Sequence, residues 1–225
     1  MKNIIQIAGI RSAQEAEMLI SCGVDYLGFP FRLDYHNEDI SEIEAAQIVS
    51  NLPSSVTAVV ITYLNRAEEV INLLQTLGAS AVQLHGDISS EEIRKLKSEM
   101  PELQIIKSMI IGRDPFSIML DRVGEFEPLV DAFITDTYDP GTGASGATGR
   151  THDWEISRKI VRISPKPVIL AGGLIPENVK EAILKVKPAG VDVHTGVENR
   201  EGYKNKDRVV KFVSETREAF IKIKT

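Results

Sequence analysis

Short runs of apolar, often β-branched residues recur along the chain, and the segments between them carry apolar residues at helical spacing. The runs predict eight strands: Ile4–Ala8, Tyr26–Phe29, Val56–Ile61, Ala81–Leu84, Gln104–Lys107, Ala132–Asp136, Val168–Ala171 and Val191–Val193. The segments between them predict eight helices: Ala13–Ser21, Glu42–Ser50, Ala67–Leu77, Ser90–Glu99, Pro115–Val123, Glu155–Ile163, Pro176–Lys185 and Lys206–Lys222. This regular alternation predicts that the strands run parallel.

Residues that favour helix starts precede several of the predicted helices. Ser12, Ser41 and Ser89 can cap the helices that follow them, because a serine hydroxyl accepts a hydrogen bond from an N–H of the first turn. Pro115 and Pro176 suit a first helical turn, where proline removes no hydrogen bond. These residues support the predicted helix boundaries.

Small or turn residues stand between several predicted helices and the next strand: Gly23-Val24-Asp25, Gly78-Ala79-Ser80 and Pro188-Ala189-Gly190. Glycine readily adopts the left-handed conformation that ends a helix. Eight strand-helix units without a domain-splitting linker predict an α/β fold, a single (β/α)8 TIM barrel over residues 1–225. An open, doubly wound sheet is the alternative, because a strand counted from one sequence is easily gained or lost.

Composition and charge limit the classes of protein. With 225 residues, of which 43% are apolar and 26% charged, the chain can bury a full core. The net charge of -6 and the pI near 5.4 disfavour nucleic-acid partners and membrane surfaces, which usually require a basic face. The chain does not open with a basic segment and a long apolar stretch, and no apolar run approaches ~20 residues. A cytoplasmic protein is therefore expected.

The single cysteine limits redox and metal chemistry. Cys22 has no second cysteine with which to form an internal disulfide or a cysteine-clustered metal site. Its position at a predicted helix end indicates packing rather than a nucleophile. No cofactor is expected.

Two glycine-containing turns follow the last two predicted strands, at Gly172-Gly173 and at Thr195-Gly196. In a (β/α)8 barrel the loops after the strands build the site, and those after strands seven and eight recurrently bind phosphate. Glycine lets backbone N–H groups approach an anion closely, and helix starts add partial positive charge. The turns therefore predict a phosphate-binding cradle; two tight turns without a ligand are the alternative.

The connection from Tyr138 to Arg150 is longer than an ordinary βα loop, and its glycines include Gly146 and Gly149. Loops of this kind often close over a site, so a lid is predicted, with a disordered insertion as the alternative. It is not a Walker A loop, because no Gly-Lys-Ser/Thr step follows a correctly spaced glycine pair.

Four groups of segments follow one another along most of the chain: Gln83-Leu84-His85-Gly86-Asp87, Gly146-Ala147-Thr148-Gly149-Arg150-Thr151-His152-Asp153-Trp154, Leu170-Ala171-Gly172-Gly173-Leu174 with Pro176-Glu177-Asn178-Val179, and Gly190-Val191-Asp192-Val193 with Gly196-Val197-Glu198. They resemble motifs of the phosphoribosylanthranilate isomerases, in the order in which that family has them. Chance is a poor explanation for so many ordered matches, and the chain is identified as a member of that superfamily.

The resemblance implies an Amadori rearrangement in tryptophan biosynthesis, which converts a phosphoribosyl amine to a 1-amino-2-ketose phosphate. Asp136 matches the family's acid, which protonates the furanose ring oxygen; capping of the adjacent loop is the alternative role. An acid near neutral pH needs the raised pKa that burial supplies. The residues expected to bind phosphate or substrate are Gly9, Arg32, Gln83, His85, Gly146, Gly149, Gly172, Gly173, Thr195 and Gly196. The expected partner is a phosphorylated sugar, and the expected assembly is a monomer or homodimer.

The base that removes the C2 proton is where the sequence departs from the family. The family's first-strand cysteine is Ala8 here, and alanine cannot accept a proton. Losing a general base typically costs about 10²–10⁴ in rate. His36 and His194, with Asp34 as a further candidate, are therefore proposed as replacements, because histidine titrates near neutral pH. For His36 the alternative is a solvent-exposed loop residue without a catalytic role. They lie on different loops without ligand spacing, so no metal is expected.

Further departures keep other functions open. The loop Arg32-Leu33-Asp34-Tyr35-His36 stands where the family has a Ser-Pro-Arg or Ser-Lys-Arg step, and His194-Thr195 stands where it has Ser-Ser. These changes favour a paralogue that keeps the phosphate cradle and Asp136. Beside the family's isomerisation, the alternatives are an isomerase, epimerase or lyase with a changed phosphosugar substrate, and a non-catalytic barrel that binds a phosphate ligand.

Overall fold

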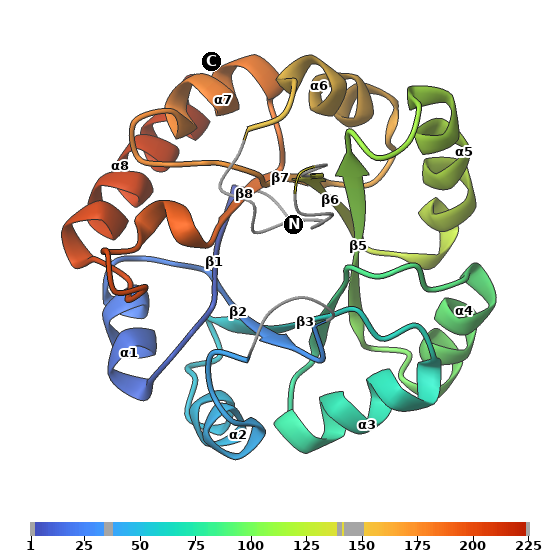
Figure 1. Ribbon diagram of the computed structural model, residues 1–225, viewed down its shortest axis with the longest axis horizontal. Helices are drawn as coiled ribbons and strands as arrows, with labels where there is room; N and C mark the ends of the chain where they lie inside the picture. The colour runs from blue at the N-terminus through green and yellow to red at the C-terminus, as the bar shows by residue number, and fades with distance from the viewer. Residues whose placement is uncertain (1–2, 34–37, 139–140, 142–150, 224–225) are drawn as a thin grey trace.

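The computed structural model describes residues 3–33, 38–138, 141 and 151–223. Its eight strands form one closed barrel in chain order, and the helices surround it (Figure 1). Every neighbouring pair of strands is parallel, including β1 with β8, which closes the ring. The predicted (β/α)8 barrel is confirmed, and the open-sheet alternative is wrong.

The strands and helices alternate along the whole described chain. The strands are β1 (Ile4–Ala8), β2 (Tyr26–Phe31), β3 (Thr57–Thr62), β4 (Ala81–Leu84), β5 (Gln104–Ile111), β6 (Ala132–Thr137), β7 (Val168–Leu170) and β8 (Gly190–Val193). The α-helices are α1 (Ala13–Ser21), α2 (Glu42–Ser50), α3 (Ala67–Leu77), α4 (Ser90–Glu99), α5 (Phe116–Phe126), α6 (Trp154–Ile163), α7 (Val179–Val186) and α8 (Lys206–Lys222). Short 3-10 helices are η1 (Glu127–Leu129) and η2 (Thr195–Val197).

Strand pairing, rather than local sequence, decides where strands end. β2 continues through Pro30 to Phe31, beyond its predicted end, because both residues pair with β3. β5 likewise continues to Ile111, where it pairs with the end of β6. β7 is shorter than predicted, so Ala171 already belongs to the loop that follows it.

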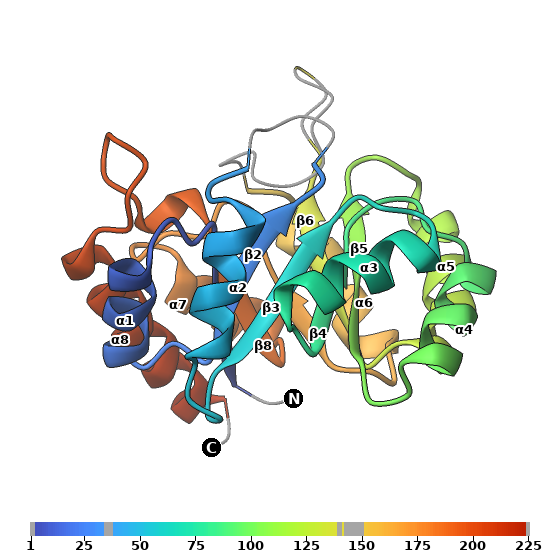
Figure 2. The ribbon, with the colours of Figure 1, turned by 90° about the horizontal axis from the view of Figure 1, so that it is seen from below.

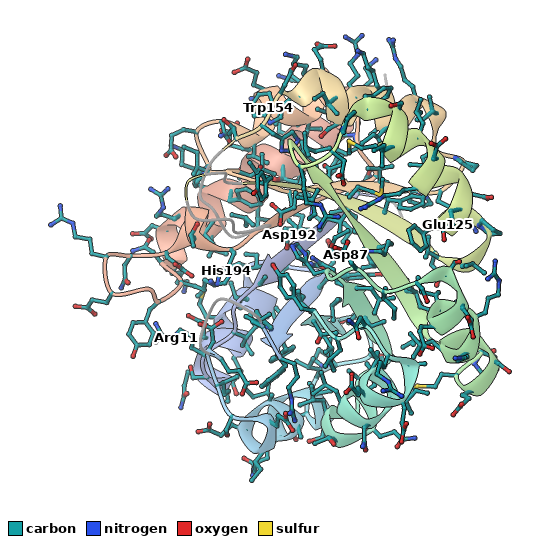
Figure 3. The ribbon with its side chains drawn as sticks, turned by 45° about the vertical axis from the view of Figure 1, so that its right-hand side comes forward. Arg11, Asp87, Glu125, Trp154, Asp192 and His194 are labelled. Atoms are coloured by element: carbon teal, nitrogen blue, oxygen red, sulfur yellow. The ribbon has the colours of Figure 1, made fainter. Side chains whose placement is uncertain are left out.

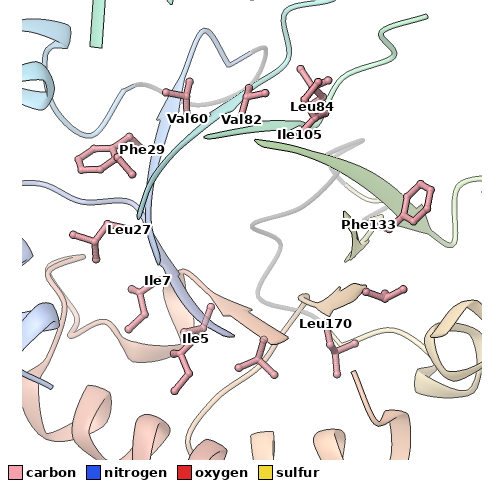
Figure 4. Packing of buried hydrophobic residues seen from close by; sticks show 14 of the residues in the cluster. Ile5, Ile7, Leu27, Phe29, Val60, Val82, Leu84, Ile105, Phe133 and Leu170 are labelled. Atoms are coloured by element: carbon pink, nitrogen blue, oxygen red, sulfur yellow. The ribbon is translucent and has the colours of Figure 1, made fainter. Parts of the chain in front are cut away.

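Apolar side chains at alternate strand positions point out of the barrel toward the helices. Figure 4 shows Ile5, Ile7, Phe29 and Phe133 on this outer side of the strands, where they belong to the main core. Because successive side chains of a strand point to opposite faces, the residues between them face the barrel interior. That interior holds a smaller apolar cluster: Ala8, Val59, Ile61, Ala81, Ile106, Ala132, Ile134, Ile169 and Ala171.

Helix starts follow the predicted caps only in part. Ser12, Ser41 and Ser89 each accept a hydrogen bond from the backbone N–H three residues later, which confirms them as caps. Pro115 and Pro176 do not lie in first helical turns, so that prediction is wrong. Pro115 is the cap residue of α5, with an extended ψ of 150°, and Pro176 lies in a turn that ends before α7 begins.

Glycine was predicted to adopt the left-handed conformation in the turns after three helices, and it does so in two of them. Gly23 and Gly78 have φ of 87° and 69°, in the left-handed region. After α7 the left-handed residue is Lys187, with φ 56°, so the prediction for that turn is wrong. Gly190 instead begins β8, where a Cβ atom would lie 2.9 Å from the carbonyl oxygen of Ile4.

The two ends of the barrel have different roles. Figure 2 shows the loops that follow the strands at one end and the turns that precede the strands at the other. In barrels of this kind the first end carries the site. None of the helices in the described part of the chain combines the length and apolarity needed to cross a membrane.

Candidate active site

A cavity of about 270 Å³ opens where β6, β7 and β8 end. Loops from the last two strands and side chains from the barrel interior form its wall. Its lining residues are Asp136, Gly172, Gly173, Leu174, Ile175, Asp192, Val193, His194, Thr195, Gly196 and Arg208. The structure thus brings together Asp136, His194 and both predicted glycine turns, which the sequence placed on three separate loops.

The turn after β7 is built around two consecutive left-handed glycines. Gly172 and Gly173 have φ of 93° and 63°, and a Cβ atom at Gly172 would lie 2.2 Å from Oγ1 of Thr137. The Asn178 side chain fixes the loop, since it accepts from the N–H of Ile175 at 2.9 Å and donates to the Gly173 carbonyl at 3.0 Å. The N–H groups of Gly172 and Gly173 have no hydrogen-bond partner among the described residues. They remain available to an anion in the cavity.

The turn after β8 packs directly against the turn after β7. A Cβ atom at Gly196 would lie only 1.9 Å from the carbonyl oxygen of Leu174, so no larger residue fits there without a backbone shift. The Arg208 guanidinium donates to the Gly196 carbonyl at 2.8 Å. Arg208 also lines the cavity, where it adds positive charge beside the two turns. Sequence reasoning missed this residue, because it lies in the helix α8 and not in a loop that follows a strand.

Asp136 lies on β6 at the inner wall of the cavity and is 7% exposed. The backbone N–H of Thr137 donates to its Oδ1 atom at 2.7 Å. Burial nevertheless dominates and raises the pKa of Asp136 to about 7. A carboxyl group with this pKa is largely protonated just below neutral pH and can donate a proton, as the sequence analysis required of it.

A second buried carboxyl group, Asp192, faces the same cavity from β8. Sequence reasoning quoted the segment Gly190–Val193 for its resemblance but did not select Asp192 as a site residue. An available indication was the presence of a charged residue in a short buried strand, since aspartate is seldom buried without a function or partner.

His194 lies on the loop after β8, close to Asp192 (Figure 3). Its ring packs on Gly9, where a Cβ atom would lie 2.1 Å from the histidine Nε2. That nitrogen is 3.5 Å from Oε1 of Glu198, which also accepts from the buried Lys204 ammonium at 2.6 Å. Gly9 therefore provides the space for His194 and is not itself a residue that lines the cavity.

Gln83 and His85 belong to a different buried cluster, at the end of β4 and the middle of β5. Gln83 accepts from Nε2 of Gln6 at 2.9 Å, and its amide lies 3.5 Å from Nδ1 of His85. Ser108 Oγ is 2.9 Å from the same histidine nitrogen. The ammonium of Lys107 is held by backbone carbonyls, among them Gly86 at 2.9 Å. We define Gln83, His85, Lys107 and Ser108 as the β4–β5 cluster.

The remaining predicted residues lie outside the cavity wall or outside the described residues. The Arg32 guanidinium pairs with Glu42 at the start of α2, and Arg32 is absent from the residues that line the cavity. Its φ of 56° gives this non-glycine residue a left-handed backbone at the end of β2. His36, Asp34, Gly146 and Gly149 lie outside the described residues. So does most of the predicted lid, which stays a prediction.

A half-buried histidine, His152, contacts the turn after β7. His152 Nδ1 lies 2.9 Å from Oγ1 of Thr137, and Nε2 lies 2.5 Å from Oγ of Ser157. Burial lowers the pKa of His152 to about 4, so the ring is neutral near pH 7 and bridges two hydroxyl groups. Gly172 packs against Thr137 and His152 themselves, since a Cβ atom there would lie 3.1 Å from Nδ1 of His152. His152 therefore positions the glycine turn, a role that the sequence analysis did not assign.

No group of three or more histidine, cysteine, aspartate or glutamate side chains in the described part of the chain is arranged to hold a metal ion. The site as described consists of two carboxyl groups, a histidine, an arginine and backbone amides.

Comparisons with known proteins agree with this geometry. The family model described as N-(5'phosphoribosyl)anthranilate (PRA) isomerase matches residues 5–215. A relative from Methanosarcina mazei, named N-(5'-phosphoribosyl)anthranilate isomerase 2, is 39% identical over 222 residues, which cover 98% of this chain and 96% of the relative. The crystal structure of phosphoribosyl anthranilate isomerase from Thermotoga maritima has a TM-score of 0.81 at 28% identity, with coverage of 96% and 98%.

A further solved structure carries a ligand. It is a phosphoribosyl anthranilate isomerase in complex with reduced 1-(o-carboxyphenylamino)-1-deoxyribulose 5-phosphate, with a TM-score of 0.78 at 26% identity. The alignment covers 96% of this chain and 98% of that chain. The likeness therefore extends over almost the whole of both proteins.

Proposed function

The chain belongs to the N-(5'-phosphoribosyl)anthranilate isomerase family, and we propose that it catalyses that family's Amadori rearrangement in the cavity at the ends of β6, β7 and β8. The family consists of isomerases of tryptophan biosynthesis, which fits an enzyme acting on a small phosphorylated sugar. The assignment of individual residues to substrate binding and proton transfer is part of the proposal.

The observation that supports it most directly is the arrangement within one cavity of an anion-binding end and an acidic end. Gly173 and Gly196 contribute backbone from the last two loops, and Arg208 adds a guanidinium beside them. Backbone N–H groups and a guanidinium suit a phosphate dianion. Asp136 lines the same cavity from β6. A phosphate bound by the turns would therefore place the sugar ring toward a carboxyl group.

Asp136 would start the reaction as the acid. Its proton passes to the furanose ring oxygen, the bond from C1 to that oxygen breaks, and the nitrogen lone pair forms a C1–N double bond. With a pKa near 7, Asp136 is neutral often enough at physiological pH to supply that proton. The N-aryl iminium ion that results carries the positive charge that makes the C2 proton acidic.

A base must then remove the C2 proton, and Ala8 offers no group for it. Two other described residues of the cavity have one: His194, which the sequence analysis proposed, and Asp192. Both lie on or just after β8, two strands along the barrel from Asp136 on β6.

Turnover of phosphoribosylanthranilate by the purified protein tests the proposal. The substrate's fluorescence should disappear with saturation kinetics, and the protein should restore growth without tryptophan to a strain that lacks the isomerase. Calorimetry with the reduced ribulose phosphate analogue and with ribose 5-phosphate separates the alternatives. Binding of either compound without turnover would indicate a changed substrate or a binding protein, and failure of both turnover and binding would contradict the site assignment.

A further inference from the structure

Asp192 lies inside the barrel on the strand that closes it. Val191 and Val193 belong to the outer apolar core, so the alternation of β8 turns Asp192 inward. It is the register partner of Gln6 on β1. Figure 3 shows Asp192 within the ring of strands.

The carboxyl group of Asp192 is buried but incompletely partnered. The residue is 8% exposed, and its Oδ1 atom has no hydrogen-bond partner among the described residues. A buried acceptor without a partner typically costs about 1–3 kcal/mol. Asp192 is also one of the residues that line the cavity, so its carboxyl group belongs to the wall that a bound molecule would meet.

The surroundings of Asp192 couple it to Asp136. Burial first, and then repulsion by Asp136, raise the pKa of Asp192 to about 7, while Gln6 and Lys204 act in the opposite direction. His194 and Arg208 are the other ionisable groups of the cavity wall. Two buried carboxyl groups that repel one another ionise in succession, so near neutral pH the pair holds about one proton. Such a pair offers an acid and a base at once.

His194 is less suitably arranged for the same task. Its Nε2 atom, the nitrogen nearest to Gly9, is already directed at Glu198. The loop around it is held by Lys204, whose ammonium is bound to Glu198 and to the His194 carbonyl. His194 thus forms part of a fixed ionic cluster at the rim, whereas Asp192 lies deeper, within the strands.

We propose that Asp192 is the base of the rearrangement and Asp136 its acid, so that two carboxyl groups replace the usual pairing of an aspartate with a cysteine. This inference rests on the proposed function. Asp192 would accept the C2 proton, and it would touch the substrate at C2.

The proton transfers balance over one turnover. Asp136 gives its proton to the ring oxygen and becomes a carboxylate. Asp192 takes the C2 proton; the C–H electron pair forms the C1–C2 double bond, and the imine electrons return to nitrogen. Asp192 then delivers a proton to C1 while Asp136 accepts the proton of the C2 hydroxyl, which becomes the ketone. Both groups end in the state in which they began, and no oxidant, reductant or cofactor is consumed.

The test is Asp192→Asn, which keeps the shape of the side chain and removes the base. We expect kcat with phosphoribosylanthranilate to fall about 10²–10⁴-fold, while calorimetry shows the reduced ribulose phosphate analogue binding within about fivefold of its wild-type affinity, since that change corresponds to about 1 kcal/mol. Asp192→Ala, measured with and without formate, separates a catalytic from a purely structural role of Asp192, because added formate should restore kcat only if the carboxylate takes part in the reaction. A small carboxylate in the vacated space should raise kcat at least about tenfold.

Asp131→Asn is the matched control, because Asp131 is a hydrogen-bonded aspartate at the opposite end of the barrel. It should keep kcat within about twofold.

Wild-type kcat retained by Asp192→Asn would overturn the inference, as would a formate-insensitive Asp192→Ala whose fold and analogue binding are intact. His194→Ala should lose less activity than Asp192→Asn; the reverse order would assign the base to His194. Absence of turnover by the wild-type protein is a separate result, and it contradicts the proposed function instead.

Discussion

Two buried polar clusters lie at the same end of the barrel, and only one of them is left with unmet hydrogen bonds. In the β4–β5 cluster, His85 is contacted by Ser108 and Gln83, and Lys107 is held by backbone carbonyls. At the cavity, by contrast, the Oδ1 atom of Asp192 has no partner among the described residues. Side chains that satisfy one another hold the barrel together, whereas Asp192 keeps one carboxylate oxygen without a partner at the wall of the cavity.

Gln6 stands between the two regions. Its amide nitrogen donates to Gln83 in the β4–β5 cluster, and its Oε1 atom has no partner among the described residues. The same residue lies beside Asp192 in the strand register. Gln6 therefore connects a cluster that stabilises the barrel to the cavity where we propose the reaction takes place. Substitutions on the two sides of Gln6 should have different effects on activity and on stability.

The largest effect is expected for Asp136→Asn. Asparagine keeps the hydrogen bond from Thr137 but has no proton to give to the ring oxygen. We expect kcat to fall about 10²–10⁴-fold while binding of the reduced ribulose phosphate analogue, measured by calorimetry, changes little. Unchanged kcat would remove Asp136 from the acid role and leave it with the alternative of capping its loop.

The pH dependence of stability is the second test, because both carboxyl groups have a pKa near 7 in the folded protein against the usual 3.8. A group whose pKa is higher in the folded than in the unfolded protein adds to the free energy of unfolding at low pH. That contribution is complete below about pH 4 and is lost as the pH rises through about 7. Asp192→Asn removes one such contribution. The free energy of unfolding should therefore fall less between pH 5 and pH 8 in the variant, by on the order of 2 kcal/mol.

Urea unfolding followed by the fluorescence of Trp154, the only tryptophan, measures this difference. Two curves that change in parallel with pH would show that Asp192 does not carry a raised pKa, and the contrast between the cavity and the β4–β5 cluster would lose its electrostatic basis.

The barrel could be predicted because the features that specify its strands and helices lie among residues close together in the sequence. Apolar runs at strand spacing and serines such as Ser12 predict where elements begin, and parallel alternation leaves few topologies. The strand ends were not predictable, because Phe31 and Ile111 are held in strands by pairing with a neighbour distant in sequence. The left-handed Lys187 shows the same limit, since a glycine was expected at that turn.

The residues of the candidate site that lie at or just after the end of a strand could be predicted from the sequence. Gly172 and Gly196 follow strands, so their position selected them, whereas Asp136, near the end of β6, was selected by its resemblance to the family's acid. Asp192 lies within a strand, and its significance depends on which way β8 faces and on Asp136, two strands away on β6. The direction of the Arg32 side chain likewise depends on Glu42, in the next helix, which the local sequence does not reveal.

Gly196→Ala tests the cavity through its shape. The new methyl group would lie 1.9 Å from the Leu174 carbonyl oxygen, so the two turns must separate. We expect a loss of about 1–3 kcal/mol in stability and about tenfold weaker binding of ribose 5-phosphate in calorimetry, equivalent to about 1.4 kcal/mol. Gly124→Ala is the control: no atom lies within 4 Å of its added methyl group, and alanine in α5 should stabilise by about 0.5–1 kcal/mol. Equal ribose 5-phosphate affinity in both variants would exclude the turns as the phosphate site.

The smallest effect is expected in the β4–β5 cluster, for Ser108→Ala. The substitution removes the 2.9 Å contact with Nδ1 of His85, but that histidine keeps Gln83 at 3.5 Å and the ring of Tyr63 at 4.9 Å. Because the buried nitrogen retains a partner, the free energy of unfolding should fall by only about 1 kcal/mol, and kcat/KM for phosphoribosylanthranilate should stay within about threefold of wild type, a difference below ~0.7 kcal/mol. A loss of activity beyond tenfold with the stability intact would show that His85 takes part in the chemistry through its orientation. The contrast between the two clusters would then be one of degree, because satisfied side chains would be serving the reaction as well.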